Sequence, residues 1–275
     1  MTTRLTAIRS QGESELAKAP SLTMNDLWAL ALAAALLVVF VLVRRPELPP
    51  RRLLVALGIT AGFAGLAWLA HGVNFGGALA GSAIAFILAG RDVRMFLLLL
   101  VLFALVLGVT RLGARRKQQL RTAEAASGRS ASQVMANLGM AGLAVALAPG
   151  NWPILALAAL AEAVADTSSS ELGMAFPAKT VLITTGKPVA PGVDGGISLV
   201  GTAAALISAA VFALAGWTAG LLSRRTAAVV ALAGFLGTLI DSLLGALLER
   251  RGWLNNDLVN FLSTASAAAL AWILV

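Results

Sequence analysis

Nine long stretches of this chain are almost free of charged residues, and they constrain its fold more than any other feature. They account for most of the 59% apolar content of the 275 residues, of which only 12% are charged. A bilayer's hydrocarbon core is about 30 Å thick, and roughly 20 apolar residues span it as an α-helix. Backbone groups in lipid need partners within their own segment, which favours helices. The sequence therefore predicts an all-α integral membrane protein and excludes an ordinary water-soluble domain.

The expected spans are 27–43, 53–70, 73–90, 95–110, 130–148, 153–165, 197–223, 226–248 and 258–275. Short spans could be re-entrant or interfacial, so we predict a polytopic bundle of about nine transmembrane helices, with eight to ten as its range. The longest expected loop, 166–196, contains a β-branched run at 181–185 followed by Gly and Pro residues. That pattern predicts a short strand and turns at the membrane surface.

The distribution of positive charge predicts the orientation. With nine spans, 13 of the 21 Lys and Arg residues lie on the side that holds the N-terminus. The positive-inside rule places that side in the cytoplasm, although Arg44, Arg45, Arg51 and Arg52 oppose this assignment. We expect a multi-pass protein of the cell (inner) membrane, with the N-terminus and a polar active-site loop in the cytoplasm.

The net charge of +8 is better explained by the anionic headgroups of the lipid bilayer than by nucleic acid. No basic block is interleaved with aromatic residues, so we expect no nucleic-acid partner. A homo-oligomer remains an alternative to a monomer. The absence of cysteine excludes disulfides, thiolate zinc sites and a cysteine nucleophile, and the single histidine, His71, excludes multi-histidine metal sites. We expect His71 in a short interfacial turn.

Ionisable residues inside spans are costly and are therefore candidates for function. Glu162 and Asp166 are four residues apart and share a helix face, and Asp241 lies inside a later span. Three serines and Glu171 follow Asp166, where the helix should end. Gly128 can end the polar segment 111–127, and Ser130 with Gln133 forms a capping box that opens the helix at 130–148. In the nine-span arrangement all these residues approach one face of the membrane.

The residues gathered there suit phosphate chemistry. Carboxylates supply hard oxygen ligands for Mg²⁺, and we assign this role to Asp166, Glu171 and Asp241. The glycines that follow Asp194 allow backbone N–H groups to approach a phosphate. The other candidate residues for binding substrate and phosphate, or for orienting them, are Arg129, Gln133, Asn137, Ser170, Lys179, Lys187, Asp194, Gly195, Gly196, Ser198, Ser242 and Asn260. No P-loop motif is present.

Five ordered motifs resemble the integral-membrane family that includes the plant phytyl-phosphate kinase of tocopherol synthesis, whose prokaryotic members were long catalogued as a domain of unknown function. They are GRSASQVMAN at 128–137, ADTSSSELG at 165–173, PGVDGGISLVGT at 191–202, GTLIDSLLGA at 237–246 and NDLVN at 256–260. Ser168, Val193 and Glu249 stand where that family often has other residues. The resemblance covers about residues 50–275.

The resemblance implies phosphoryl transfer from a nucleoside triphosphate, with CTP as the expected donor, to an isoprenyl monophosphate such as phytyl, geranylgeranyl or farnesyl phosphate. Asp166, Glu171, Asp241 and Asn260 would be the catalytic residues, with Mg²⁺ as cofactor. We accordingly divide the chain into a cytoplasmic leader at 1–24, a first transmembrane helix and loop at 25–50, and a membrane-embedded catalytic domain at 51–275. Two alternatives remain: a CTP-dependent lipid cytidylyltransferase, which uses the same groups, and an ion-coupled transporter or lipid flippase.

The expected orientation can be tested by labelling. The variants Ser127→Cys and Lys187→Cys should resist a membrane-impermeant maleimide in intact cells and react with it in inverted membrane vesicles. The native chain contains no cysteine, so it provides a control without background labelling. Labelling of either variant from outside intact cells would overturn the orientation.

Overall fold

The computed structural model describes residues 22–44, 48–112, 128–148, 150–176 and 178–275. Its α-helices are α2 (Met24–Arg44), α3 (Pro50–Leu69), α4 (Phe75–Arg91), α5 (Val93–Arg111), α7 (Ala131–Leu147), α8 (Trp152–Ala175), α9 (Leu199–Thr218), α10 (Arg224–Leu247) and α11 (Asn256–Leu274). The strands β1 (Thr180–Leu182) and β2 (Gly196–Ser198) and the 3₁₀-helix η2 (Glu249–Arg251) complete the described elements.

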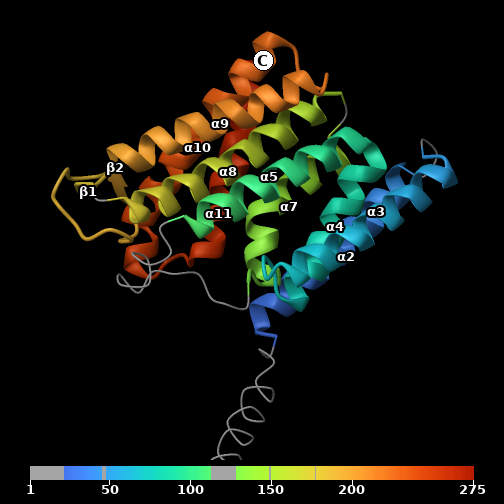
Figure 1. Ribbon diagram of the computed structural model, residues 1–275, viewed down its shortest axis with the longest axis horizontal. Coiled ribbons are helices and arrows are strands. Elements are labelled where there is room, and N and C mark those ends of the chain that lie inside the picture. Colours follow the sequence, from blue (N-terminus) through green and yellow to red (C-terminus); the bar gives the residue numbers. More distant parts are fainter. Residues whose placement is uncertain (1–21, 45–47, 113–127, 149, 177) are drawn as a thin grey trace, which may run out of the picture.

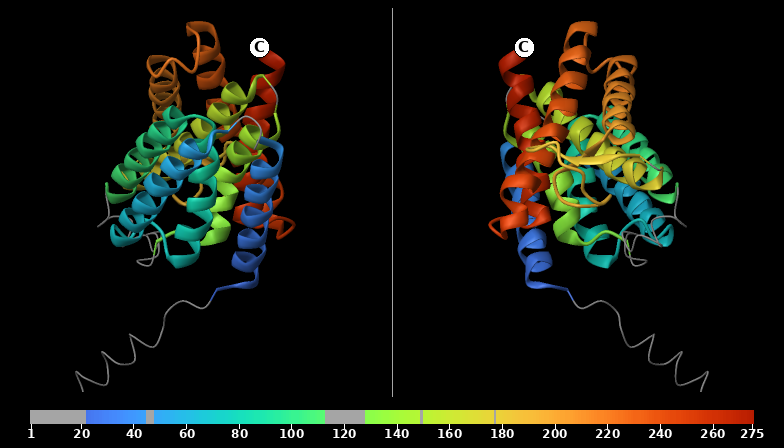
Figure 2. Two further views of the ribbon diagram at one scale, coloured as in Figure 1. Left: turned by 90° about the vertical axis from the view of Figure 1, so that its right-hand side faces the viewer. Right: turned by 90° about the vertical axis from the view of Figure 1, so that its left-hand side faces the viewer.

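Helix α8 forms the centre of the bundle (Figures 1 and 2). It packs against α9, α10 and α11 on one side and against α7 and α5 on the other. Helices α2, α3 and α4 continue the bundle beyond α7. Every residue of α8 from Ala156 to Ala165 is buried, and six of these ten are alanine. Small side chains allow neighbouring helix backbones to approach closely, as in other membrane bundles.

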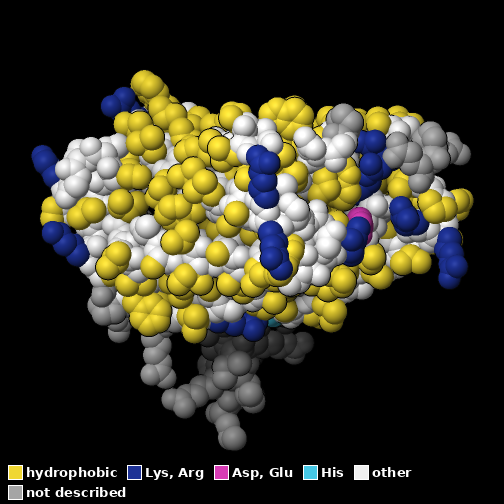
Figure 3. Space-filling model, turned by 90° about the horizontal axis from the view of Figure 1, so that it is seen from above, with side chains coloured by type: hydrophobic (Ala, Val, Ile, Leu, Met, Phe, Trp, Pro, Cys, Tyr) yellow, Lys and Arg dark blue, Asp and Glu magenta, His cyan; other side chains and the backbone are white. Residues whose placement is uncertain are grey.

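The outer surface of the bundle is largely hydrophobic. Figure 3 shows apolar side chains across most of one face, with Lys and Arg side chains scattered among them. Large apolar residues such as Leu66, Leu199 and Ile273 are exposed on the helices. Within the described ranges six helices are long and apolar enough to cross a membrane: α2, α3, α5, α9, α10 together with η2, and α11. The outer surface therefore suits contact with lipid rather than water.

Each of the nine predicted spans contains an α-helix in the part of the chain that the structure describes. Helices α4 and α7 are apolar but only 17 residues long, and the acids and serines of α8 make it less apolar than a membrane span requires, so none of these three belongs to the six. The number of crossings and the cytoplasmic orientation stay predictions, as does the domain division. Most of the predicted leader and most of the polar segment 111–127 lie outside the described residues.

One of the arginines that oppose the predicted orientation has a structural contact. The buried Arg44 side chain donates hydrogen bonds to the carbonyl oxygens of Ala146 and Ala148, each at 3.3 Å. A positive side chain at a helix C-terminus satisfies carbonyls that have no partner within the helix. Arg44 therefore ties the end of α2 to the end of α7.

The predicted end of the helix at 153–165 was wrong. Helix α8 continues ten residues further, to Ala175, so the polar residues from Asp166 to Glu171 are helical rather than part of a loop. Two contacts explain the extension. The Ser168 hydroxyl donates to the Val164 carbonyl at 2.7 Å, which satisfies it inside the helix. Gly201 lets α9 lie against this segment, because a β-carbon there would stand 2.8 Å from the Ser169 carbonyl oxygen.

The loop after α8 forms the short strand that the sequence predicts. Strand β1 pairs antiparallel with β2, with Val181 opposite Ile197, and this sheet lies at one end of the bundle (Figure 1). The fold is therefore helical with one two-stranded sheet among the described residues, rather than strictly all-α. The predicted capping box of Ser130 and Gln133 is confirmed at the start of α7, and Gly128 has a φ of 77° just before it.

Close packing at Gly234 of α10 leads to a prediction about the stability of a substituted protein. A β-carbon there would stand 2.8 Å from the Ala161 β-carbon and 3.0 Å from its carbonyl carbon, so α10 or α8 would have to move. Overpacking of this kind costs about 1–3 kcal/mol. We expect Gly234→Ala to lower the melting temperature in detergent.

The matched control is Gly62→Ala in α3, where a β-carbon meets nothing within 4 Å. Both changes gain helix propensity, by about 1 kcal/mol. A Gly234→Ala protein as stable as Gly62→Ala would show that α8 and α10 do not require this contact.

Candidate active site

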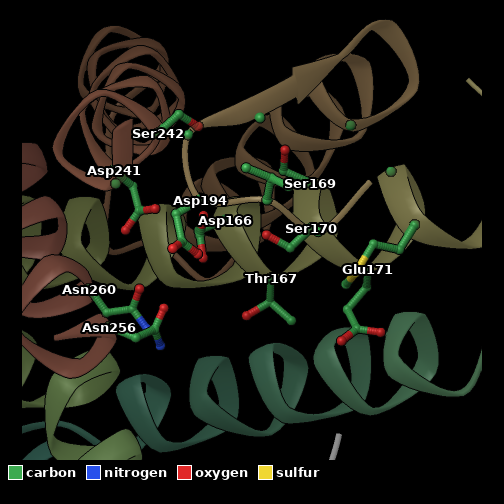
Figure 4. A pocket seen from close by; sticks show the side chains of 18 of the residues that line it. Asp166, Thr167, Ser169, Ser170, Glu171, Asp194, Asp241, Ser242, Asn256 and Asn260 are labelled. Carbon is green, nitrogen blue, oxygen red and sulfur yellow. The ribbon is translucent and has the colours of Figure 1, made fainter. Parts of the chain in front are cut away.

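A polar pocket of about 440 Å³ opens beside the β1–β2 sheet. Helices α7, α8, α10 and α11 contribute to its wall, together with the turn that leads into β2. Figure 4 shows the carboxylates of Asp166, Asp194 and Asp241 near one another, with Asn256 and Asn260 beside them. Residues from four of the five predicted motifs thus meet within Figure 4, and Arg129, Gln133 and Asn137 of the remaining motif also line the pocket.

Three carboxylates form a compact group at this pocket: Asp166 and Asp241 line it, and Glu162 is buried next to them. Oxygen atoms of Glu162, Asp166 and Asp241 all lie within 4.8 Å of one another. Glu162 is 1% exposed, so its carboxylate is almost completely removed from solvent. Like charges at this separation repel, and burial makes the charged forms more costly. Such a group therefore requires positive charge or protons to be stable.

Glycine residues in α10 allow these carboxylates to come together. A β-carbon at Gly237 would stand 2.6 Å from Cγ of Glu162, and one at Gly234 would collide with Ala161. Helix α10 can therefore lie directly against the part of α8 that carries Glu162. This close approach places Asp241, one helical turn after Gly237, next to the acids of α8.

The unsatisfied oxygens of the group suit a divalent cation. Within the described residues, neither Oε1 of Glu162 nor Oδ2 of Asp241 has a hydrogen-bond partner, although both atoms are buried. Buried polar atoms normally have partners, so a bound group is a direct explanation for these two. Carboxylate oxygens are the ligands that Mg²⁺ prefers. The donor set therefore fits the predicted cofactor.

One predicted metal ligand, Glu171, lies away from the compact carboxylate group (Figure 4). Glu171 lines the pocket, but Figure 4 shows its carboxylate far from those of Asp166 and Asp241. Because α8 remains helical, five residues turn Glu171 about 140° away from Asp166, whereas four residues turn Glu162 only about 40°. The compact group among the described residues therefore contains Glu162 rather than Glu171, and the metal site itself stays a prediction.

The predicted glycine-rich turn closes the pocket from the side of the sheet. Gly195 has a φ of 74°, and a β-carbon there would overlap Ala246 of α10. Only glycine combines this left-handed conformation with such close contact. The turn also brings Asp194 to Asp166 (Figure 4). Ser198 is the N-cap of α9, where its hydroxyl accepts from the Gly201 N–H at 3.1 Å.

Arg129 is held at the pocket by its backbone. Its N–H donates to the Gly72 carbonyl at 3.2 Å, and its carbonyl accepts from the Asn74 N–H at 2.9 Å. On the following helix, Gln133 completes the capping box and Asn137 donates to the Gln133 carbonyl at 2.9 Å. All three residues line the polar pocket, as predicted.

Most other predicted residues line the same pocket, and two do not. Ser170, Gly196, Ser242 and Asn260 are part of its wall. Lys179 and Lys187 are exposed and lie outside the lining, so they do not join the residues that face the carboxylates.

Several lining residues were given no binding role by the sequence analysis: Thr167, Ser169, Gly201, Gly245, Glu249 and Asn256. All six lie within or close to the five motifs, and Thr167 and Ser169 would have followed from continuing α8 as a helix. The four-residue spacing of Glu162 and Asp166 was the signal that Glu162 shares a helix face with Asp166 and could join it in one group.

Comparison with known proteins shows a family and distant relatives. The family model described as integral membrane protein DUF92 matches residues 58–268, which is more than half of the chain. An uncharacterized membrane protein of Synechocystis sp. is 31% identical over 187 residues, covering 65% of this chain and 72% of its own length. An uncharacterized membrane protein of Methanocaldococcus jannaschii is 34% identical over 186 residues, covering 62% and 72%.

A third relative is the chloroplastic protein VTE6 of Arabidopsis thaliana. It is 32% identical over 111 residues, which are 39% of this chain and 33% of the plant protein. No solved structure matches the chain. The similarity to VTE6 therefore concerns only part of each protein.

The cluster of three carboxylates predicts that divalent cations stabilise the protein. We expect MgCl₂ or MnCl₂ to raise the melting temperature of the native protein, because a bound cation offsets repulsion among the three acids. Ligand binding stabilises by about 2.7 kcal/mol when the free ligand is 100 times its Kd. Glu162→Gln should remove most of the rise and, without added cation, should leave the protein as stable as before or more so.

Asp257→Asn is the matched control, because Asp257 is an acid of α11 that belongs neither to the three-carboxylate group nor to the pocket lining. Its cation response should equal that of the native protein. A full response in Glu162→Gln would exclude Glu162 as a ligand.

Proposed function

Because the chain belongs to the integral membrane protein family DUF92, we propose that it transfers a phosphoryl group from a nucleoside triphosphate to an isoprenyl monophosphate, giving the isoprenyl diphosphate. The observation that carries this proposal is the group of Glu162, Asp166 and Asp241, two of which line a polar pocket that also contains a glycine-rich turn and Arg129. The partial similarity to VTE6 supports it.

In this proposal the reaction needs little from the protein beyond alignment and charge neutralisation. An oxygen of the lipid monophosphate attacks the γ-phosphorus of the nucleotide, and the bond from that phosphorus to the bridging oxygen breaks, which releases the nucleoside diphosphate. The attacking oxygen is already anionic at neutral pH, so no side chain has to remove a proton from it. Positioning and electrostatic stabilisation account for most of the rate in reactions of this kind.

Residues in and beside the pocket would divide the tasks of alignment and charge neutralisation. Glu162, Asp166 and Asp241 would hold Mg²⁺, which supplies positive charge beside the nucleotide phosphates. Arg129 would neutralise charge on the transferred or accepting phosphate, and the N–H groups around Gly195 and Gly196 would approach a phosphate oxygen. Asn256 and Asn260 would orient the substrates. We propose CTP as the donor, and a cytoplasmic site on the cell membrane as the location.

Product analysis distinguishes this function from its alternatives. Purified protein in detergent would be incubated with Mg²⁺, each nucleoside triphosphate in turn, and phytyl, geranylgeranyl or farnesyl monophosphate. We expect isoprenyl diphosphate and nucleoside diphosphate. A CDP-lipid with pyrophosphate would instead identify a cytidylyltransferase. No covalent product with any pair would contradict both enzymes and favour a transporter.

Asp241→Asn tests the role of the carboxylates in turnover. The change keeps the size of the side chain but removes the charge that a hard cation requires, so we expect turnover to fall at least about 100-fold, or roughly 2.7 kcal/mol in the barrier. The melting temperature should stay unchanged or rise, because a buried charge is removed.

Melting temperature and turnover would be measured on one preparation, with Asp257→Asn as the active control. A stable Asp241→Asn protein with native turnover at low Mg²⁺ would exclude the metal-ligand role. A protein that loses stability as well as activity would indicate that Asp241 has a structural partner.

A further inference from the structure

A second, mainly apolar pocket of about 350 Å³ lies between α3, α4, α5 and α7. Its lining includes Phe63 of α3, Gly81 of α4, Leu102 and Phe103 of α5, and Val134 and Leu138 of α7. The rings of Phe63 and Phe103 meet edge to face with their centres 5.2 Å apart. The size lies within the range of small-molecule sites, which are mostly apolar with a few polar groups.

Three residues line both pockets. Arg129, Gln133 and Asn137 face the polar pocket and also the apolar one. They are four residues apart, so they form one stripe that begins just before α7 and continues along it. The loop residues Gly72 and Val73, beside the backbone of Arg129, line the apolar pocket as well. A ligand that reaches both pockets must therefore pass this stripe.

We propose that the apolar pocket holds the hydrocarbon chain of the isoprenyl monophosphate, with its phosphate beside Arg129. The inference rests on the proposed function for the identity of the substrate. Along α5 the lining extends from Leu99 to Arg111, which corresponds to about 18 Å of helix and suits a chain of several isoprene units. A phosphate on such a chain would reach the polar pocket while the chain stays among apolar side chains.

The apolar pocket would contribute more to the selection among lipid chains than to the affinity for the lipid. A hydrocarbon chain leaving the bilayer exchanges one apolar environment for another, so little hydrophobic free energy is gained. The pocket can distinguish chains by their length and branching. Protein interiors are close-packed, so a chain whose volume does not match the pocket fits poorly. We therefore expect the chain to be selected by shape.

Gly81 offers a direct way to change the volume of the pocket. A β-carbon there would lie 3.8 Å from Cγ1 of Val134, which is ordinary contact, so a side chain can be added without a backbone collision. Gly81→Leu would extend into the apolar pocket. Gly108→Leu is the matched control on α5, where a β-carbon meets nothing within 4 Å and the residue is not part of the lining.

The experiment measures binding of farnesyl and geranylgeranyl monophosphate to each purified protein without nucleotide. Gly81→Leu should weaken binding of the longer lipid about tenfold, or 1.4 kcal/mol, more than that of the shorter one. Gly108→Leu should bind both as the native protein does. Equal effects of the two variants, unchanged binding in Gly81→Leu, or no binding of either lipid to the native protein would overturn the inference.

A second measurement uses only the native protein, so it does not depend on how a variant folds. A geranylgeranyl monophosphate analogue with a diazirine at its chain end should crosslink to α3, α4, α5 or α7 residues of the apolar pocket, and unlabelled geranylgeranyl monophosphate should prevent this. Crosslinks elsewhere, or equal protection by phosphatidic acid, would contradict the inference. Because these readouts are binding alone, they can succeed while the kinase assay fails, and the assay can succeed while they fail.

Discussion

The placement of carboxylates in and next to the continuously buried stretch of α8 is the constraint on which the rest of the bundle depends. Glu162 is 1% exposed at the middle of α8, where water cannot stabilise its charge. Such a residue is tolerated in a membrane protein only when other protein groups or a cation surround it. The alanines of α8 and the glycines of α10 let the neighbouring helices approach closely enough to do so. The arrangement of the surrounding helices thus follows from the need to enclose α8.

Helix α7 separates two environments of opposite character. On one side lie the acids, the glycine-rich turn and the asparagines of α11, and on the other the aromatic and aliphatic side chains of α3 and α5. Its polar stripe belongs to both sides, and the backbone of Arg129 is fixed by the loop at Gly72 and Asn74. An amphipathic substrate could therefore be held at its head and along its chain by elements that are joined directly.

The sequence predicted the helices and most of the pocket, because both depend on local signals. Apolar runs marked nine segments, and Ser130 with Gln133 marked the start of α7. Two outcomes required information on packing. The end of α8 depends on α9 lying against Ser169 through Gly201, which no local pattern indicates. Lys179 and Lys187 shared the motif-bearing loop with Asp194, but proximity along the chain did not bring them to the pocket.

The central position of α8 has a consequence for biosynthesis. Its closest packing partners, α9, α10 and α11, are all encoded after it, so the ribosome completes α8 before these helices exist. Until they arrive, the face of α8 that carries Glu162 and Asp166 lacks Asp241 and the helices that later enclose it. The segment is also less apolar than its neighbours, so membrane insertion alone cannot retain it as firmly. Assembly of the polar pocket is therefore necessarily late, completed only when α11 has been made and has packed against a segment made long before.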